Sequence, residues 1–176
     1  MHLVQLYARH RWQAQQEDPM SPTTTDCVIG SVVRRDGVSS LDAPLFIRDV
    51  CDKLSASLVR EQAIDGYVHG LEQSVLQFGI VIRHPNVSEP GMVHRDGGKG
   101  IVLLYLQECQ GPHRFGFGFF CGRTAQSCLE PAWYIQTPGT VLYMNPQLWH
   151  CSPSNESSQP VYAMYCWDKT RTPTLL

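Results

Sequence analysis

The chain has 176 residues and a formal net charge of −2, with 43% hydrophobic and 17% charged residues. This length and composition predict one globular domain with a sizeable core rather than a disordered chain. The charges form no basic stripe and no apolar run approaches the roughly 20 residues of a membrane span, so we expect neither a nucleic-acid nor a membrane partner.

The N-terminal segment "MHLVQLYARHRW" does not have the pattern of a secretory leader. It lacks the apolar stretch and the small-residue cleavage site of a signal peptide. The seven cysteines make an odd set without a CxxC pattern. Both observations favour a reduced, cytoplasmic setting. A Cys121–Cys128 pair in an oxidising compartment is the alternative.

Loops and helices are predicted for the first part of the chain. Residues 17–30 are rich in Pro, Ser and Thr and predict a loop. Residues 42–60 predict a helix with Asp42 as its N-cap and one buried stripe, formed by Phe46, Val50, Leu54 and Leu58. A second helix is expected within residues 61–77, where Tyr67, Leu71 and Val75 repeat the helical spacing.

From Phe78 the pattern changes to short apolar or alternating runs. These runs are "FGIVIRH", "GIVLLYLQ", "RFGFGFF", "WYIQ", "TVLYM" and "VYAMYCW", and turn residues separate them. Evenly spaced short strands of this kind are typical of a sandwich or a jelly roll. We therefore expect one mainly β domain over residues 1–176. Residues 78–167 would form the roll, and residues 1–77 a helical and loop buttress.

The tripeptide His94-Arg95-Asp96 has two interpretations. A protein kinase catalytic loop contains the same three letters, but it also needs an Asn shortly after the Asp and a glycine-rich loop upstream. This chain has neither and is too short for two kinase lobes. The second interpretation is a pair of metal ligands.

His94 and Asp96 are two residues apart, so on an extended strand both side chains point to the same face. His150 ends the later segment "TPGTVLYMNPQLWH" and can supply a third ligand. Two His and one carboxylate form the facial triad of non-haem Fe(II) sites. The alternative is that the H-x-D pair arises by chance and that His150 is an ordinary core or surface residue.

The flanking residues carry a resemblance to a known family. The segments "HRDGGKGIVLLYLQE", "TPGTVLYMNPQLWH" and "VYAMYCW" resemble, in order and spacing, the Fe(II)/2-oxoglutarate-dependent dioxygenase superfamily, and within it the prolyl 4-hydroxylase-like branch. The resemblance implies a double-stranded β-helix in which His94, Asp96 and His150 bind Fe(II). It also implies 2-oxoglutarate and O₂ as cosubstrates, and a small molecule or an amino-acid side chain as substrate.

The chain departs from this family at the cosubstrate site. The resemblance places a basic residue on the last major strand, where an Arg would pair with the distal carboxylate of 2-oxoglutarate, but this chain has Val161 there. A base from another strand can replace it, and the candidates are Arg114, Arg83 and Lys99. Arg114 is the preferred candidate.

Two further residues are expected near the cosubstrate. Tyr105 resembles the family's cosubstrate-contacting Tyr, although a Tyr in an apolar strand also suits the core. His84 precedes the H-x-D segment and is a candidate pocket residue. Because neighbours on a strand face opposite sides, Arg83 should face outward if His84 faces the pocket.

Three functions remain compatible with the sequence. The first is an Fe(II) oxygenase that uses 2-oxoglutarate. The second is an oxidase on the same scaffold that binds its substrate directly at the iron without 2-oxoglutarate, as Val161 permits. The third is a catalytically silent metal-binding module. Asp96 favours hydroxylation or another oxidation over halogenation, because the related halogenases carry a small residue in its place.

Overall fold

The computed structural model describes residues 1–13, 24–33, 41, 43–64, 75–107, 115–120, 132–135 and 137–170. Their secondary structure, in chain order, is α1 (His2–Gln13), β1 (Thr24–Val33), α2 (Leu45–Ile64), β2 (Val75–Arg83), β3 (Gly100–Tyr105), β4 (Phe115–Phe120), β5 (Ala132–Ile135), β6 (Val141–Met144), β7 (Trp149–Cys151) and β8 (Val161–Asp168). In the part of the chain that the structure describes, neither helix is long and apolar enough to cross a membrane.

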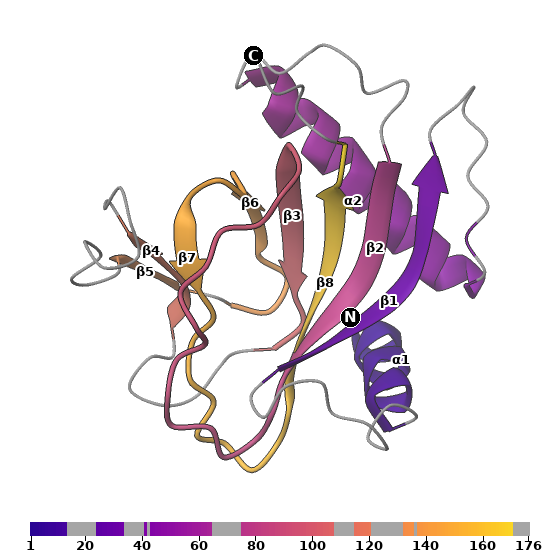
Figure 1. Ribbon diagram of the computed structural model, residues 1–176. Helices are drawn as coiled ribbons and strands as arrows, with labels where there is room; N and C mark the ends of the chain where they lie inside the picture. The colour runs from indigo at the N-terminus through magenta and orange to yellow at the C-terminus, as the bar shows by residue number, and fades with distance from the viewer. Residues whose placement is uncertain are drawn as a thin grey trace.

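The strands form two antiparallel sheets. The larger sheet has the order β1-β2-β8-β3-β6, and the smaller one has the order β5-β4-β7. Figure 1 shows the smaller sheet beyond β6, on the side away from β1. Strands distant in sequence are therefore neighbours, as in the pairing of β8 with both β2 and β3. This is the mainly β, jelly-roll architecture with flanking helices that the sequence predicts.

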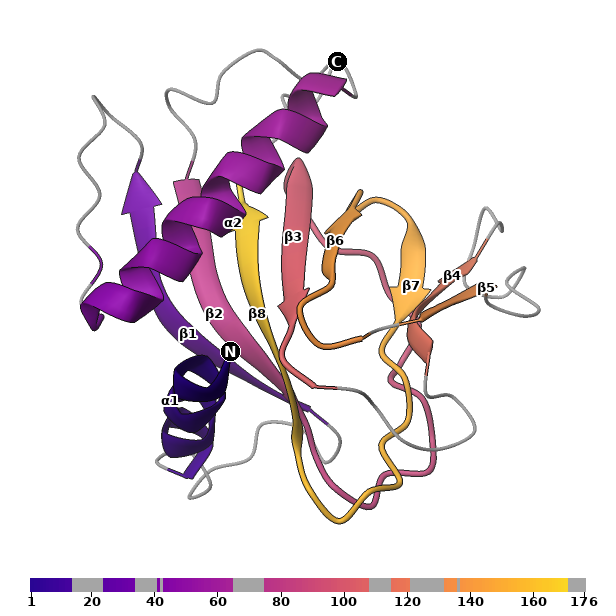
Figure 2. The same ribbon diagram turned by 180° about the vertical axis from the view of Figure 1, so that it is seen from behind.

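Both helices lie on one side of the large sheet, and α2 runs diagonally across it (Figure 2). The buried apolar stripe of α2 consists of Ile47, Cys51, Leu54 and Leu58. Of the predicted stripe, Leu54 and Leu58 are buried and Val50 is partly buried against the core, whereas Phe46 is 37% exposed and does not belong to it. Phe46 packs edge-on against Tyr7 of α1 instead, with ring centroids 6.3 Å apart. The predicted cap Asp42 lies outside the described residues.

Two predictions for the N-terminal part are corrected by the structure. Residues 24–30 belong to β1 rather than to a loop, and β1 pairs with β2 along its length. The large sheet therefore begins before residue 78, within the segment expected to be only a buttress. The second helix is also wrong where it is described: residues 61–64 continue α2, and Val75 begins β2. Tyr67 and Leu71 lie outside the described residues.

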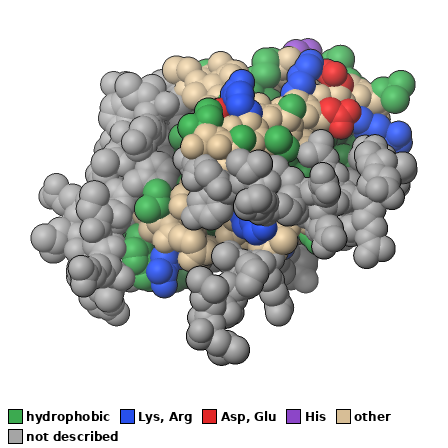
Figure 3. Space-filling view, turned by 90° about the horizontal axis from the view of Figure 1, so that it is seen from above, with side chains coloured by type: hydrophobic (Ala, Val, Ile, Leu, Met, Phe, Trp, Pro, Cys, Tyr) green, Lys and Arg blue, Asp and Glu red, His purple; other side chains and the backbone are tan. Residues whose placement is uncertain are grey.

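Charges of both signs are exposed on one face of the molecule. Figure 3 shows Lys and Arg side chains interspersed with Asp and Glu side chains on the face seen from above. On the exposed side of α2, Lys53 pairs with Asp49 at 2.7 Å. Such exposed pairs contribute little to stability but keep a helix surface well solvated.

One face of the large sheet packs against the helices, and the other face borders a cavity. On β2, Phe78, Ile80 and Ile82 belong to the core beneath the helices. Val81 packs into a second apolar cluster on the opposite face, together with Leu103 and Tyr165. Because side chains alternate along a strand, every odd-numbered residue near Val81 points to this second face. That face forms one wall of the cavity described below.

Gly98 makes the tight turn between Asp96 and β3. Its φ is +90°, and a Cβ atom there would lie 2.1 Å from the carbonyl oxygen of Asp168. The neighbouring Lys99 donates its backbone N–H to the same carbonyl at 2.9 Å. A side chain at Gly98 would therefore meet both backbone strain and a backbone clash.

We predict that Gly98→Ala lowers the free energy of unfolding by at least about 1–2 kcal/mol, the cost of a left-handed non-glycine residue alone. Gly97→Ala is the matched control, because Gly97 has an ordinary φ and a Cβ added there would have no atom within 4 Å. Urea unfolding of both variants checks the prediction. Equal stability of the two variants would contradict it.

Candidate metal centre and its cavity

The fold brings His94 and His150 side by side. The two residues form an isolated antiparallel bridge in which each backbone N–H donates to the carbonyl of the other at 2.9 Å. Their rings are consequently close, with centroids 4.4 Å apart. His150 lies on β7, and His94 lies in the extended segment that leads to β3. The backbone pairing therefore sets the separation of the two imidazoles.

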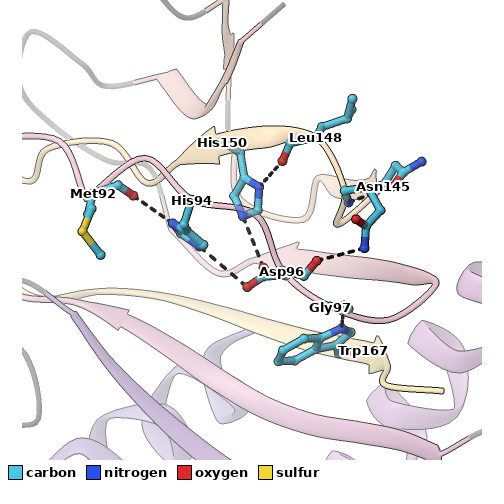
Figure 4. Close-up of polar contacts among 9 residues, drawn as sticks. Met92, His94, Asp96, Gly97, Asn145, Leu148, His150 and Trp167 are labelled. Atoms are coloured by element: carbon cyan, nitrogen blue, oxygen red, sulfur yellow. Dashed lines mark hydrogen bonds and ion pairs between the residues drawn. The ribbon is translucent and has the colours of Figure 1, made fainter. Parts of the chain in front are cut away.

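Asp96 completes the group, as Figure 4 shows. One carboxylate oxygen, Oδ2, lies 3.2 Å from His150 Nε2, and Oδ1 lies 3.8 Å from His94 Nε2. One potential ligand atom from each residue lies within 4.8 Å of the others. An octahedral ion with bonds of about 2.1 Å places adjacent donors about 3 Å apart. The three side chains therefore fit a divalent metal ion after small rotations.

The outer nitrogens of both imidazoles are held by the backbone. His94 Nδ1 lies 2.8 Å from the carbonyl oxygen of Met92, and His150 Nδ1 lies 2.8 Å from that of Leu148. A carbonyl oxygen only accepts, so each Nδ1 carries the proton and donates it. In the neutral ring each Nε2 then carries the lone pair, and each Nε2 lies toward Asp96. This is the tautomer that a metal ligand needs.

The backbone of Asp96 is fixed as well. Its N–H donates to the carbonyl of Pro146 at 2.8 Å, and its own carbonyl accepts from Gln147 Nε2 at 3.2 Å. The next carbonyl, that of Gly97, accepts from Trp167 Nε1 at 2.8 Å. These contacts join the H-x-D segment to the turn before β7 and to β8. The carboxylate is therefore positioned before any metal arrives.

The three residues border a cavity of about 220 Å³. His150 is buried on the inner side, whereas the His94 side chain is 43% exposed. Apolar lining comes from Val81, Ile101, Leu103, Met144 and Trp167, and polar lining from Thr24, Asp26, Ser152 and Tyr165. An ion held by the triad would thus face a partly open, partly apolar space.

Asp26 is a cavity residue that the sequence did not reveal, because its segment was predicted to be a loop. Tyr165 Oη donates to the Asp26 carboxylate, at 2.9 Å from Oδ1 and 3.2 Å from Oδ2, and accepts from Gln77 Nε2 at 2.7 Å. Gly79 makes room for this hydroxyl, since a Cβ there would lie 2.4 Å from it. The β-branched Thr, Val and Ile residues of "TTDCVIG" were the available signal for a strand.

Partial removal of water in the cavity raises the pKa of the Asp26 carboxyl. The hydrogen bond from Tyr165 and the positive charge of Lys169 act in the opposite direction, and the negative charge of Asp96 adds to the rise. Burial likewise raises the pKa of the Tyr165 hydroxyl, so this group stays protonated and remains a donor. Asp26 is therefore a carboxylate whose charge the protein only partly compensates.

A second cavity adjoins the first. Thr24, Val81, Leu103 and Ser152 line both cavities, and the second is also lined by Arg83, Tyr105, Val161 and Tyr162. Arg83 is only 3% exposed and is the direct partner of Val161 in the pairing of β2 with β8. Its Nη2 donates to the carbonyl of Glu89. The residue Arg83 thus lies beside the position where the family resemblance expects a base.

The other predicted cosubstrate residues have different places. His84 lies on the helix side of the sheet, where its ring hydrogen-bonds to Thr25 Oγ1 at 2.8 Å and contacts Trp12. His84 lines neither of these two cavities, whereas Arg83 lines the second one. The two residues therefore face the opposite sides from those expected. Lys99 lines neither cavity, and Arg114 lies outside the described residues. Tyr105 lines the second cavity.

Comparison with known proteins shows that the fold of this chain is similar to that of several solved structures. No family model and no curated protein sequence matches the chain. Similar solved structures include a Burkholderia pseudomallei oxidoreductase of the 2OG-Fe(II) oxygenase family, with 13% identity, TM-score 0.51, and 93% of this chain and 79% of that chain covered. A Pseudomonas putida prolyl-4-hydroxylase matches at 17% identity and TM-score 0.51, over 97% and 85% of the two chains.

AtDAO1, a dioxygenase for auxin oxidation from Arabidopsis thaliana, matches in its 2-oxoglutarate complex at 14% identity and TM-score 0.54, over 90% of this chain and 68% of that chain. The chain spans only 27% of EvdMO1, another similar structure, at a TM-score of 0.43. At such identities the likeness concerns the fold. The fold is that of the 2-oxoglutarate and Fe(II) oxygenase structures, a double-stranded β-helix, as the sequence resemblance implied.

We predict that His94→Ala and His150→Ala each abolish stoichiometric Fe(II) binding, because each removes one of three protein ligands. His84→Ala is the matched control and should bind iron like the wild type, since His84 faces the helices. Anaerobic loading followed by metal analysis measures this. Full iron content in both triad variants would rule out the site.

A second prediction concerns pH and the metal-free protein. Ionising a carboxyl whose folded-state pKa is raised destabilises the folded state, so Asp26→Asn should be more stable than the wild type at neutral pH. The difference should shrink as pH falls through the folded-state pKa and vanish below the ordinary value of 3.8. Urea unfolding between pH 7 and pH 3 measures it, with Asp52→Asn on the exposed side of α2 as control. A pH-independent difference would contradict the prediction.

Proposed function

We propose that this protein is a non-haem Fe(II) oxygenase that uses 2-oxoglutarate and O₂ to oxidise a small molecule or an amino-acid side chain. The observation that carries the proposal is the pair of adjoining cavities, which lead from the His94, Asp96 and His150 triad to Arg83 and Tyr105. One end offers metal ligands, and the other is mainly apolar with the buried Arg83 among its lining residues. A linear molecule with a carboxylate at each end suits this arrangement.

In the proposed site, the triad holds Fe(II) through His94 Nε2, His150 Nε2 and the Asp96 carboxylate. Fe(II) held there would supply the activation of O₂. In the balanced reaction, one oxygen atom of O₂ enters the substrate and the other enters succinate, which forms together with CO₂ from 2-oxoglutarate. The backbone bonds to both Nδ1 atoms keep the imidazoles in the ligand tautomer.

Arg83 is the base that we assign to the distal carboxylate of 2-oxoglutarate, in place of the preferred sequence candidate Arg114. Val161 and Arg83 are register partners, so the guanidinium can reach from β2 the site that an Arg on β8 would occupy. Between this end and the metal, Val81 and Leu103 line both cavities and suit the methylene groups of the cosubstrate. The planar fork of the guanidinium matches a carboxylate in two parallel hydrogen bonds.

Tyr105 is proposed as a second partner of the same carboxylate. It is 3% exposed and lines the second cavity together with Arg83. Its backbone is fixed at the end of β3, where its N–H donates to the carbonyl of Thr140 at 3.0 Å. A hydroxyl next to a guanidinium supplies an additional hydrogen bond to a buried anion. Core packing and cosubstrate binding are compatible roles for this side chain.

The test is an anaerobic titration of the Fe(II) protein with 2-oxoglutarate, followed by the visible charge-transfer band, and then succinate detection after O₂ is admitted. We predict that Arg83→Met weakens 2-oxoglutarate binding about 100-fold or more, because it leaves a desolvated carboxylate without its cation. Arg95→Met is the matched control: Arg95 is exposed, with its guanidinium carbon 4.8 Å from the centre of the Trp149 ring.

Iron content and urea unfolding of Arg83→Met establish that the variant is folded. Unchanged 2-oxoglutarate affinity in a folded Arg83→Met protein would remove Arg83 from the site. Iron-loaded wild type that gives neither the band nor succinate at millimolar 2-oxoglutarate would overturn the cosubstrate proposal. In that case, the oxidase that binds its substrate directly at the iron becomes the supported function. A wild type that binds no iron at all would overturn the oxygenase itself.

A further inference from the structure

We propose that the substrate carries a cationic nitrogen, an ammonium or guanidinium group, and that the Asp26 carboxylate binds it. The proposal deepens the proposed oxygenase function because it names the chemical class of its substrate. The binding contact itself does not depend on turnover. Asp26 lies on β1, lines the same cavity as the metal triad, and is not one of the three ligands.

The protein compensates the Asp26 charge only in part, through the Tyr165 hydroxyl and the positive charge of Lys169, which does not line the cavity. Among the described residues that line it, there is no Lys or Arg. Within the described part of the chain, the hydrogen bonds to the Asp26 carboxylate come from the single Tyr165 hydroxyl. An ionised carboxylate offers about four acceptor sites. The remaining sites are therefore available to a donor that enters the cavity.

The charges expected in the loaded site point the same way. Fe(II) carries two positive charges, and Asp96 contributes one negative charge as its ligand. The two carboxylates of 2-oxoglutarate add two negative charges, and Arg83 adds one positive charge, so these groups cancel. Asp26 is then the remaining negative charge that faces the substrate space. A substrate with one positive charge neutralises it, whereas an anionic substrate would be repelled.

The carboxylate is also positioned rather than mobile. Tyr165 Oη is fixed between Gln77 and Asp26, and the missing side chain of Gly79 leaves the space for it. Thr24 lies two residues before Asp26 on the same face of β1 and lines the cavity, as does Ser152. Their hydroxyls add acceptors for the several N–H groups of an ammonium or guanidinium ion. The raised pKa of Asp26 agrees with this assignment, because a bound cation would lower it.

A purely structural role for Asp26 is the competing explanation, in which its bond to Tyr165 only anchors the edge strand β1. Binding of small probes separates the two explanations. The probes are n-butylamine, n-butylguanidine and the neutral isostere 1-butanol, at pH 7, with Zn(II) in place of Fe(II) and saturating 2-oxoglutarate. Ligand-observed NMR titrations give the affinities without any turnover.

We expect the wild type to bind both cations about 10-fold or more tightly than 1-butanol, the worth of a charge-assisted hydrogen bond. Asp26→Asn keeps the acceptor for Tyr165 and should lose this preference. Asp26→Glu keeps the charge and should retain the preference, and Asp52→Asn should behave like the wild type. Equal binding of cations and alcohol by the wild type, or an intact preference in Asp26→Asn, would overturn the proposal.

The two proposals fail in distinguishable ways. The same titrations are repeated without metal and 2-oxoglutarate. If Asp26-dependent binding of the cations persists in a protein that binds no 2-oxoglutarate, the substrate class stands and the cosubstrate proposal falls. If 2-oxoglutarate binds in the Arg83-dependent manner but the cations show no preference, the cosubstrate proposal stands and the role of Asp26 falls.

Discussion

The antiparallel bridge between His94 and His150 is the contact on which the candidate site depends. Two backbone hydrogen bonds of 2.9 Å join segments that lie far apart in the chain, and they place both imidazoles on one side of the roll. Backbone bonds to each Nδ1 then select the nitrogen that faces Asp96. Because folding already holds these side chains in place, a metal ion that binds between them loses little free energy to ordering its ligands.

Strand alternation divides the remaining chemistry between the two faces of the large sheet. Most even-numbered residues of β2 and β8 pack beneath the helices, whereas Val81, Arg83 and the odd-numbered residues of β8 line the cavities on the other face. Tyr162 belongs to the core beneath the helices and also borders the second cavity. Arg83, Tyr165 and Val161 are all odd-numbered and thus share the functional face, while His84 turns to the helices. A change of one residue in the register of β2 would exchange these roles completely. The core beneath the helices therefore protects the position of the cavity residues.

The cavity concentrates interactions that are unfavourable for stability alone. Arg83 is a buried cation, and the pKa of the Asp26 carboxyl is raised by desolvation. The absence of a side chain at Gly79 leaves space for Tyr165, and the positive φ of Gly98 allows the turn after Asp96. Both glycines make the unfolded chain more flexible, which lowers stability. Buried charges that lower the stability of the folded protein are typical of binding sites, where a bound ligand compensates the charge. Asp26 and Arg83 line adjoining cavities, in keeping with the proposed site for an anion at one end and a cation at the other.

Local patterns in the sequence predicted the strands after Phe78, the facing pair His94 and Asp96, and His150 as the candidate third ligand, and the family resemblance pointed to Val161 in place of a base. These features depend on residue spacing, which folding preserves. The tertiary structure decided the rest. Residues on both faces of β2 are buried, so the sequence could not show that Arg83 rather than His84 faces the cavities. Strand β1 was taken for a loop, which hid Asp26, because only pairing with β2 makes its polar residues part of a sheet. Phe46 and Val50 fit the helical period as well as Ile47 and Cys51 do, and only contact with the sheet selects the buried pair.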